Sequence, residues 1–246
     1  MGNWKTCTIA DLGTVVGGAT PSTKKPENYD GGTIAWITPK DLAEFSGRFI
    51  SHGERNITQT GLNSCSAQMM PKHTVLFSSR APIGYVAIAE NDVCTNQGFK
   101  SVVPNENTDY MFLYYLLLNN RQNIEHMGSG TTFKEVSGKT MRSIQVRVPE
   151  SKEEQIRISS MLSVIDDKIE ENERINKNLT NNEPCESVRC DASGSSLTHG
   201  GIPTDSYGDK RYEHVAKWSA NIFGAAWRVM LMWLRGPGRK CPIRRT

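Results

Sequence analysis

The sequence feature that most constrains the fold is an uninterrupted helical stretch over residues 151–180. It follows Pro149, and Ser151 with Glu154 three residues later has the spacing of a capping box. No Gly or Pro interrupts it. At 1.5 Å per residue such a helix rises about 45 Å, at least the span of the domain that precedes it. We therefore expect it to need a partner helix to bury its apolar side.

The apolar residues of this stretch recur at heptad spacing, which predicts a coiled-coil seam. The seam is apolar at one end and carries two asparagines towards the other, through Ile158, Leu162, Ile165, Ile169, Asn172, Asn176 and Leu179. We expect residues 151–180 to act as a spacer and dimerisation helix. The alternative is an amphipathic helix packed on its own domain.

Residues 1–150 have the pattern of an α+β domain with short strands and many turns. Residues 4–9 start the domain, the expected strands cover residues 33–37, 75–77, 86–88 and 143–148, and a helix is expected over residues 109–124. After residue 180 the periodicity stops, so we expect residues 181–246 to form an irregular, poorly ordered tail.

Composition gives little guidance about partners. The net charge of +3 comes from the tail, and residues 1–150 are almost neutral, so any contact with nucleic acid depends on where the basic residues lie. The six cysteines show no CxxC spacing, which indicates neither a zinc site nor a disulfide framework and favours a reducing cytoplasm. The apolar run at residues 220–234 is too short for a membrane span, and Arg228 breaks it.

The chain lacks the motifs of common catalytic sites. Gly138-Lys139-Thr140 resembles the end of a phosphate-binding loop, but Phe133 stands where the first glycine is required, and we expect no helix to open there. No nucleophile elbow, zinc-protease helix or adenine methyltransferase motif occurs. We expect no catalytic residue and no metal site in this chain.

Several segments match one family pattern in order along the chain. They are residues 18–22 (GATPS), 35–42 (AWITPKDL), 57–62 (ITQTGL), 78–84 (SSRAPIG), 94–100 (CTNQGFK), 130–138 (GTTFKEVSG), 148–149 (VP) and 154–156 (EQI), which lead into the long helix. In this order they resemble the specificity subunit of a Type I restriction–modification system.

The resemblance implies a non-catalytic subunit in which residues 1–150 form a DNA target-recognition domain that reads half of a bipartite site. It implies that the long helix acts as a ruler between half-sites and a dock for methyltransferase subunits, which connect to a translocase–nuclease subunit. Those partners would use S-adenosylmethionine, ATP and Mg, and this chain would bind no cofactor. The whole complex would be a cytoplasmic restriction and adenine-methylation enzyme without a membrane component.

The chain departs from the family pattern in two ways. A complete subunit has two recognition domains and two long helices, whereas this sequence has one of each and ends its helix near Pro184. We therefore expect a half-length form that pairs with a second copy or another half subunit. A truncated or frameshifted, non-functional subunit is the alternative.

DNA recognition requires cationic and hydrogen-bonding side chains on loops that face the duplex. The candidates expected on loops or element ends are Lys24, Lys25, Lys40, Arg80, Gln97, Lys100, Thr131, Thr132, Lys134, Ser137, Lys139 and Arg142. Taken one at a time, each cation is better explained as a solvated surface charge, and the set on loops of one domain is what favours DNA contact.

Two other classes of function compete with this one. One is a protein-interaction module that uses the long helix without touching DNA, and the other is a self-contained enzyme acting on DNA. The missing active-site motifs argue against the enzyme, and DNA binding separates the specificity subunit from the interaction module.

Overall fold

The computed structural model describes residues 3–43, 45–130 and 134–181, with side chains up to Asn178. The chain divides into two compact units, Met1–Met161 and Leu162–Thr246. The first unit holds all the strands of the described residues and most of the helices. It is an α+β fold, as the sequence predicts.

A five-stranded mixed sheet forms the centre of the first unit. Its strand order is β2–β9–β6–β7–β4, and all neighbours are antiparallel except β4 and β7. The strands are β2 (Gly13–Gly17), β4 (Phe49–Ile50), β6 (Val75–Ser79), β7 (Ile83–Ala89) and β9 (Lys100–Pro104).

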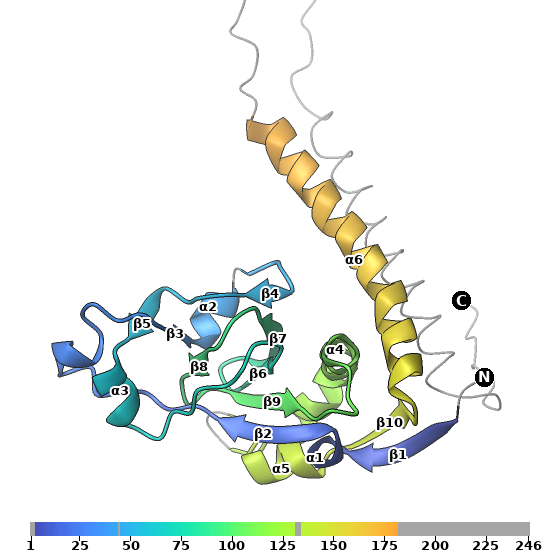
Figure 1. Ribbon diagram of the computed structural model, residues 1–246, viewed down its shortest axis with the longest axis horizontal. Helices are drawn as coiled ribbons and strands as arrows, with labels where there is room; N and C mark the ends of the chain where they lie inside the picture. The colour runs from blue at the N-terminus through green and yellow to red at the C-terminus, as the bar shows by residue number, and fades with distance from the viewer. Residues whose placement is uncertain (1–2, 44, 131–133, 182–246) are drawn as a thin grey trace, which may run out of the picture. The chain divides into compact units, whose positions relative to one another are not determined.

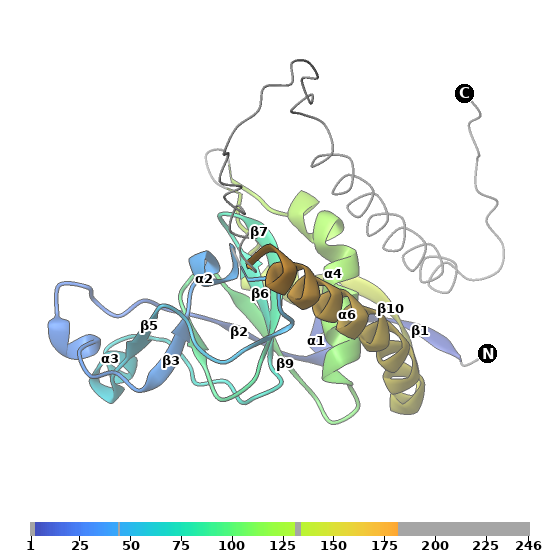
Figure 2. The ribbon, with the colours of Figure 1, turned by 90° about the horizontal axis from the view of Figure 1, so that it is seen from above.

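Two smaller sheets flank this centre. One has the order β5 (Arg55–Ile57), β3 (Ile34–Ile37) and β8 (Cys94–Thr95), and the other pairs β1 (Trp4–Thr8) with β10 (Gln145–Pro149). In Figures 1 and 2 the three-stranded sheet lies at one end of the domain and the β1–β10 pair at the other.

Short helices and one long helix connect the strands of the first unit. The short ones are α1 (Ile9–Leu12), a 3-10 turn (Pro26–Asn28), α2 (Pro39–Ala43), α3 (Gln59–Asn63) and α5 (Gly138–Ser143). The longer α4 (Tyr110–His126) is capped by the Asp109 carboxylate, which accepts from the N–H of Phe112 at 2.7 Å.

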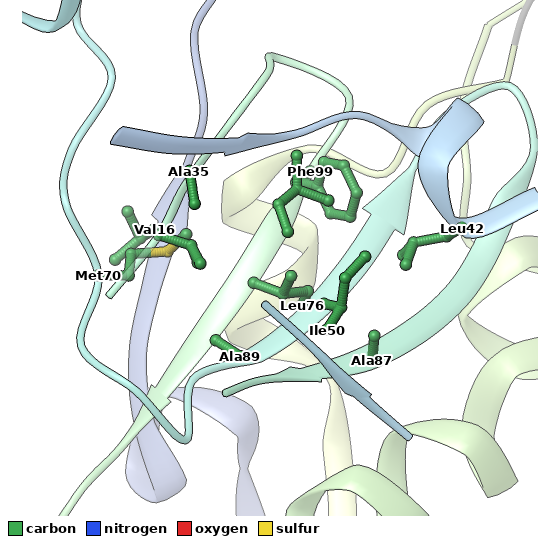
Figure 3. Close-up of a cluster of buried hydrophobic side chains, with 11 residues drawn as sticks. Val16, Ala35, Leu42, Ile50, Met70, Leu76, Ala87, Ala89 and Phe99 are labelled. Carbon is green, nitrogen blue, oxygen red and sulfur yellow. The ribbon is translucent and has the colours of Figure 1, made fainter. Parts of the chain in front are cut away.

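The core forms where the apolar faces of the sheets meet. Figure 3 shows side chains from β2, β3, β6 and β7 pointing toward one another, with Phe99 and Leu76 fully buried. The helix α4 packs on β7 and β6 and buries Leu113 and Leu117 completely. Burial of each such side chain stabilises the fold by about 1.5–3 kcal/mol.

The helix α6 (Lys152–Asn181) is thirty residues long, as expected from its uninterrupted pattern. The hydroxyl of Ser151 accepts from the N–H of Glu154 at 3.2 Å, which supplies one half of the expected capping box. Its first turns, which belong to the first unit, are held by Gln155 and Ser159, both almost fully buried.

The structure confirms most of the expected elements, corrects two expectations and adds two strands. The stretch 75–77 pairs with 86–88 as expected. The strands β2 and β9 were not predicted from the sequence. Ser78 and Ser79, which were expected to lie in a loop, extend β6. Gly138 does open a helix, α5, because Ser137 caps it and Met141 packs into the core. The expectation for residues 182–246 lies outside the described residues.

Candidate nucleic-acid interface

The five-stranded sheet brings three connecting segments to one of its ends. Because β2 and β9 pair antiparallel with Gly17 opposite Lys100, the end of β2 meets the start of β9. The N–H of Ser79, at the end of β6, donates to the carbonyl of Gly98 at 2.7 Å. The segments that follow β2, β6 and β8 therefore meet, where the arrowhead of β2 lies beside the start of β9 in Figure 1. We call this the loop end of the sheet.

A fourth segment, just before α5, joins the loop end from far along the chain. Glu135 pairs with Ser129 through two backbone hydrogen bonds of 2.9 and 3.1 Å, and it also forms an isolated bridge with Arg80. The N–H of Val136 donates to the carbonyl of Ser79 at 3.0 Å. Backbone pairing rather than side-chain charge thus fixes this segment against the end of β6.

Two predicted cations lie against one carboxylate at the loop end, and a third comes just before it in the chain. A carboxylate oxygen of Glu135 lies 3.3 Å from the Lys100 ammonium, and its other oxygen lies 3.8 Å from the Arg80 guanidinium. Lys134, the residue before Glu135, is exposed. We name Arg80, Lys100 and Lys134 the basic cluster. Its charge exceeds that of the carboxylate it surrounds, so this end of the sheet can attract a polyanion.

Neutral polar groups border the basic cluster. The hydroxyl of Thr20, after β2, donates to the side-chain oxygen of the exposed Gln97, before β9. This contact joins two of the segments, and the amide nitrogen of Gln97 still presents donors for a base edge. The predicted contacts Thr131 and Thr132 lie outside the described residues.

Three predicted lysines are not part of the cluster. Lys24 and Lys25 are exposed on the long segment after β2, where Lys25 lies 3.9 Å from the Glu27 carboxylate. Lys40 lies on α2 and forms a 2.7 Å ion pair with Glu54. Since an exposed pair of this kind contributes at most about 1 kcal/mol, DNA phosphate could replace either carboxylate.

The three predicted contacts around α5 differ from expectation because they belong to a helix. Ser137 is the N-cap, and its hydroxyl accepts from the N–H of Thr140 at 3.0 Å, so its role is to start the helix. Lys139 and Arg142 project from the exposed side of α5, not from a loop. They remain candidates for phosphate contact.

One cation near the loop end was missed by the sequence analysis. Arg121 is exposed on α4, and a Cβ built on Gly84 at the start of β7 would lie 2.2 Å from its Cγ. A Cβ on Gly128 would lie 3.1 Å from Ile83 Cδ1 and 3.5 Å from Lys134 Cβ, so Gly128 also lies close to the start of β7. No sequence signal marks Arg121, because only tertiary packing brings α4 against β7.

The predicted seam of α6 differs along its length. Its apolar members Ile158, Leu162, Ile165 and Ile169 are half-buried, Asn172 and Asn176 are exposed, and the side chain of Leu179 lies outside the described residues. A second apolar row, which the sequence analysis missed, is more exposed: Met161 at 65%, Val164 at 60% and Ile175 at 45%. The helix thus offers two apolar faces.

The described residues contain no cluster of three or more His, Cys, Asp or Glu side chains that could hold a metal ion. In that same part of the chain, no helix is both long and apolar enough to cross a membrane.

The sequence of this chain matches one family of known proteins. Residues 1–181 match the model of the Type I restriction modification DNA specificity domain. The chain is 45% identical over 179 residues to the Type I restriction enzyme MjaIX specificity subunit of Methanocaldococcus jannaschii. It is 27% identical over 169 residues to the EcoR124I/EcoR124II specificity subunit of Escherichia coli. These matches cover 72% and 66% of this chain but only 41% and 40% of the two relatives.

Solved structures share the fold. The crystal structure of the HsdS subunit from Thermoanaerobacter tengcongensis matches 70% of this chain and 39% of its own, with a TM-score of 0.53 and 19% identity. A structure of the type I R-M system, solved to explain its assembly and conformational transition, matches 72% of this chain and 41% of its own, with a TM-score of 0.56 and 21% identity. The chain therefore belongs to the family of Type I restriction–modification DNA specificity subunits.

Proposed function

We propose that this chain is a DNA-reading specificity subunit whose basic cluster contacts the duplex at the loop end of the sheet. The observation that carries the proposal is the meeting of Arg80 and Lys100 at the Glu135 carboxylate, with the exposed Lys134 directly before Glu135 in the chain. Cations and amides on neighbouring segments are the groups that bind phosphates and read base edges.

The chemistry proposed for this chain is recognition without bond breaking. Lys100 and Lys134 supply point charges for phosphate, whereas the planar guanidinium of Arg80 can donate two parallel hydrogen bonds to a guanine edge. The carboxamide of Gln97 can pair with adenine by donating one hydrogen bond to N7 and accepting one from the N6 amino group. The methylation and cleavage belong, in this proposal, to partner subunits that carry S-adenosylmethionine, ATP and Mg.

The experiment that tests the basic cluster is a titration of short duplex DNA of mixed sequence at several salt concentrations. Arg80→Ala and Lys134→Ala should each weaken binding and reduce the slope of log K against log salt by about one. The control is Lys72→Ala, an exposed lysine just before β6, at the opposite end of the sheet. Equal affinity and slope in both cluster variants and the control would contradict the proposal.

We also infer that the recognition domain is joined to a second one through pairing of α6. Its matches reach only about two fifths of the length of its relatives, and the proposed reader covers one half-site. Pairing through the heptad seam would supply a second reader at a fixed distance. Methyltransferase subunits are the other proposed partners of this helix.

The exposed second row of α6 favours one alternative function. Met161 and Val164 are apolar and more than half exposed, which is typical of a helix that binds another protein. A pure interaction module would show protein partners but no DNA affinity in the titration above.

A further inference from the structure

Glu135 is an acidic residue at the centre of a surface that otherwise attracts DNA. Its backbone is fixed on two sides, by the double hydrogen bond to Ser129 and by the bridge to Arg80. The carboxylate therefore has little freedom to swing away from the basic cluster. A group held so firmly among cations affects any polyanion that approaches them.

The two cations around Glu135 differ in how far solvent reaches them. The Lys100 side chain is only 16% exposed, whereas those of Arg80 and Glu135 are 36% and 41% exposed. The Lys100 ammonium is thus mostly shielded from solvent and lies 3.3 Å from a Glu135 carboxylate oxygen. The Arg80 guanidinium lies 3.8 Å from the other oxygen and is more exposed to water. Of the two pairs, the one with Arg80 is the easier to exchange for another partner.

We propose that Glu135 sets the discrimination between DNA sequences. This inference rests on the proposed function. Its carboxylate neutralises part of the basic cluster and repels phosphate, so a duplex of arbitrary sequence gains less from Arg80 and Lys100 than it would without Glu135. A duplex whose base edge accepts two hydrogen bonds from the Arg80 guanidinium can replace the carboxylate at that residue. Phosphate can also accept two hydrogen bonds from a guanidinium, but the charge of Glu135 repels it, whereas a neutral base edge carries no charge for Glu135 to repel. Glu135 is thus a specificity-determining residue that acts through Arg80.

The test compares Glu135→Gln with wild type on a short duplex of mixed sequence. The variant keeps the side-chain shape and the backbone pairing but frees two cations. Affinity for this duplex should rise about tenfold, and the slope of log K against log salt should steepen by about one to two. Glu135→Asp, which keeps the charge, should stay within about twofold of wild type.

Two controls separate this effect from general charge. Glu90→Gln removes the same charge from an exposed glutamate just after β7, at the opposite end of the sheet, and should leave the affinity nearly unchanged. In an Arg80→Ala background, Glu135→Gln should give a clearly smaller gain, since part of its effect runs through Arg80. A melting curve for each variant shows that it is folded.

The outcomes distinguish this inference from the proposed function. If Arg80→Ala weakens binding but Glu135→Gln binds no better than wild type, the role of Glu135 is overturned and the DNA interface stands. If Glu135→Gln and Glu90→Gln raise affinity equally, the effect is general charge, and the inference fails again. If neither Arg80→Ala nor Glu135→Gln changes affinity or salt slope, the interface itself is misplaced.

Discussion

At the scale of single residues, the close approach of two backbone segments at the loop end depends on Gly18. A Cβ at Gly18 would lie 2.1 Å from the carbonyl oxygen of Asn96 and 2.2 Å from that of Thr95, whereas one at Gly17 would meet only Lys100 Cδ at 4.0 Å. The N–H of Ala19 donates to Thr95 at 3.0 Å in the same place. The segment after β2 can lie against β8 only because position 18 has no side chain.

Gly18→Ala should therefore lower the free energy of unfolding by about 1–3 kcal/mol, because backbone atoms must move apart to admit the methyl group. Gly17→Ala, its neighbour, should cost much less. Urea denaturation of both variants provides the measurement. Equal destabilisation by the two substitutions would show that the close approach at Gly18 has no energetic consequence.

The thiol of Cys94 gives a chemical test at the same scale. Burial raises its pKa from 9.0 to about 12, and the thiol donates to the carbonyl of Ala35 at 3.4 Å. The thiol therefore stays protonated and unreactive, and its contribution to stability, complete below pH 9.0, is lost as the pH rises towards 12. Iodoacetamide at mildly alkaline pH should modify the half-buried Cys65 before Cys94. Equally fast modification of both in the folded protein would contradict this.

At the scale of elements, a polar joint fixes the start of α6 to the N-terminus of α4. The side-chain oxygen of Gln155 accepts from the N–H of Asp109 at 3.0 Å, and the hydroxyl of Ser159 donates to the Asp109 carboxylate at 2.7 Å. Lys152 adds a hydrogen bond of 2.6 Å to the carbonyl of Glu106. Asp109, which caps the N-terminus of α4, thus also holds the first turns of α6 in place.

Gln155→Ala should cost about 1–3 kcal/mol of stability, since it leaves the half-buried N–H of Asp109 without its acceptor. Gln122→Ala, which removes the same side chain from an exposed site on α4, should cost under about 0.5 kcal/mol. Thermal denaturation of both variants would decide. A Gln155→Ala variant as stable as Gln122→Ala would rule out the joint.

The elements also show which parts of the fold can be predicted from sequence. The apolar runs of β6 and β7 and the uninterrupted α6 were predictable, because their own residues specify the structure. The strand β2 was not, since glycines bracket its short sequence and its pairing with β9 is distant in the chain. The six-residue α5 was missed because packing against α1 and β2, not helix propensity, stabilises it.

The members of the candidate site could be named from sequence, but not their arrangement. Arg80, Lys100 and Lys134 were singled out from their loop-like surroundings. That Arg80 and Lys100 meet at Glu135 depends on backbone pairing across about fifty residues of sequence, which has no local signature. Arg121 was not recognised as a candidate for the same reason, since only tertiary packing brings α4 against β7.

At the scale of the whole molecule, the account requires a partner for α6. Ile165→Asp places a charge in the proposed seam and should convert a dimer of the chain into monomers, because a buried unpaired carboxylate is costly. Val164→Asp is the matched control, on the adjacent, more exposed row. Light scattering measures both. A wild-type monomer, or a dimer broken only by Val164→Asp, would exclude self-pairing through the seam.

The loop end of the sheet is proposed to read DNA sequence. The most direct measurement is a selection of bound sequences from a pool of random duplexes, with wild type and Arg80→Ala in parallel. The account predicts that wild type enriches a defined motif and that Arg80→Ala loses preference at about one base pair of it, as expected for a residue that contacts a base edge. A wild-type selection without enrichment, or an unchanged motif in Arg80→Ala, would contradict it.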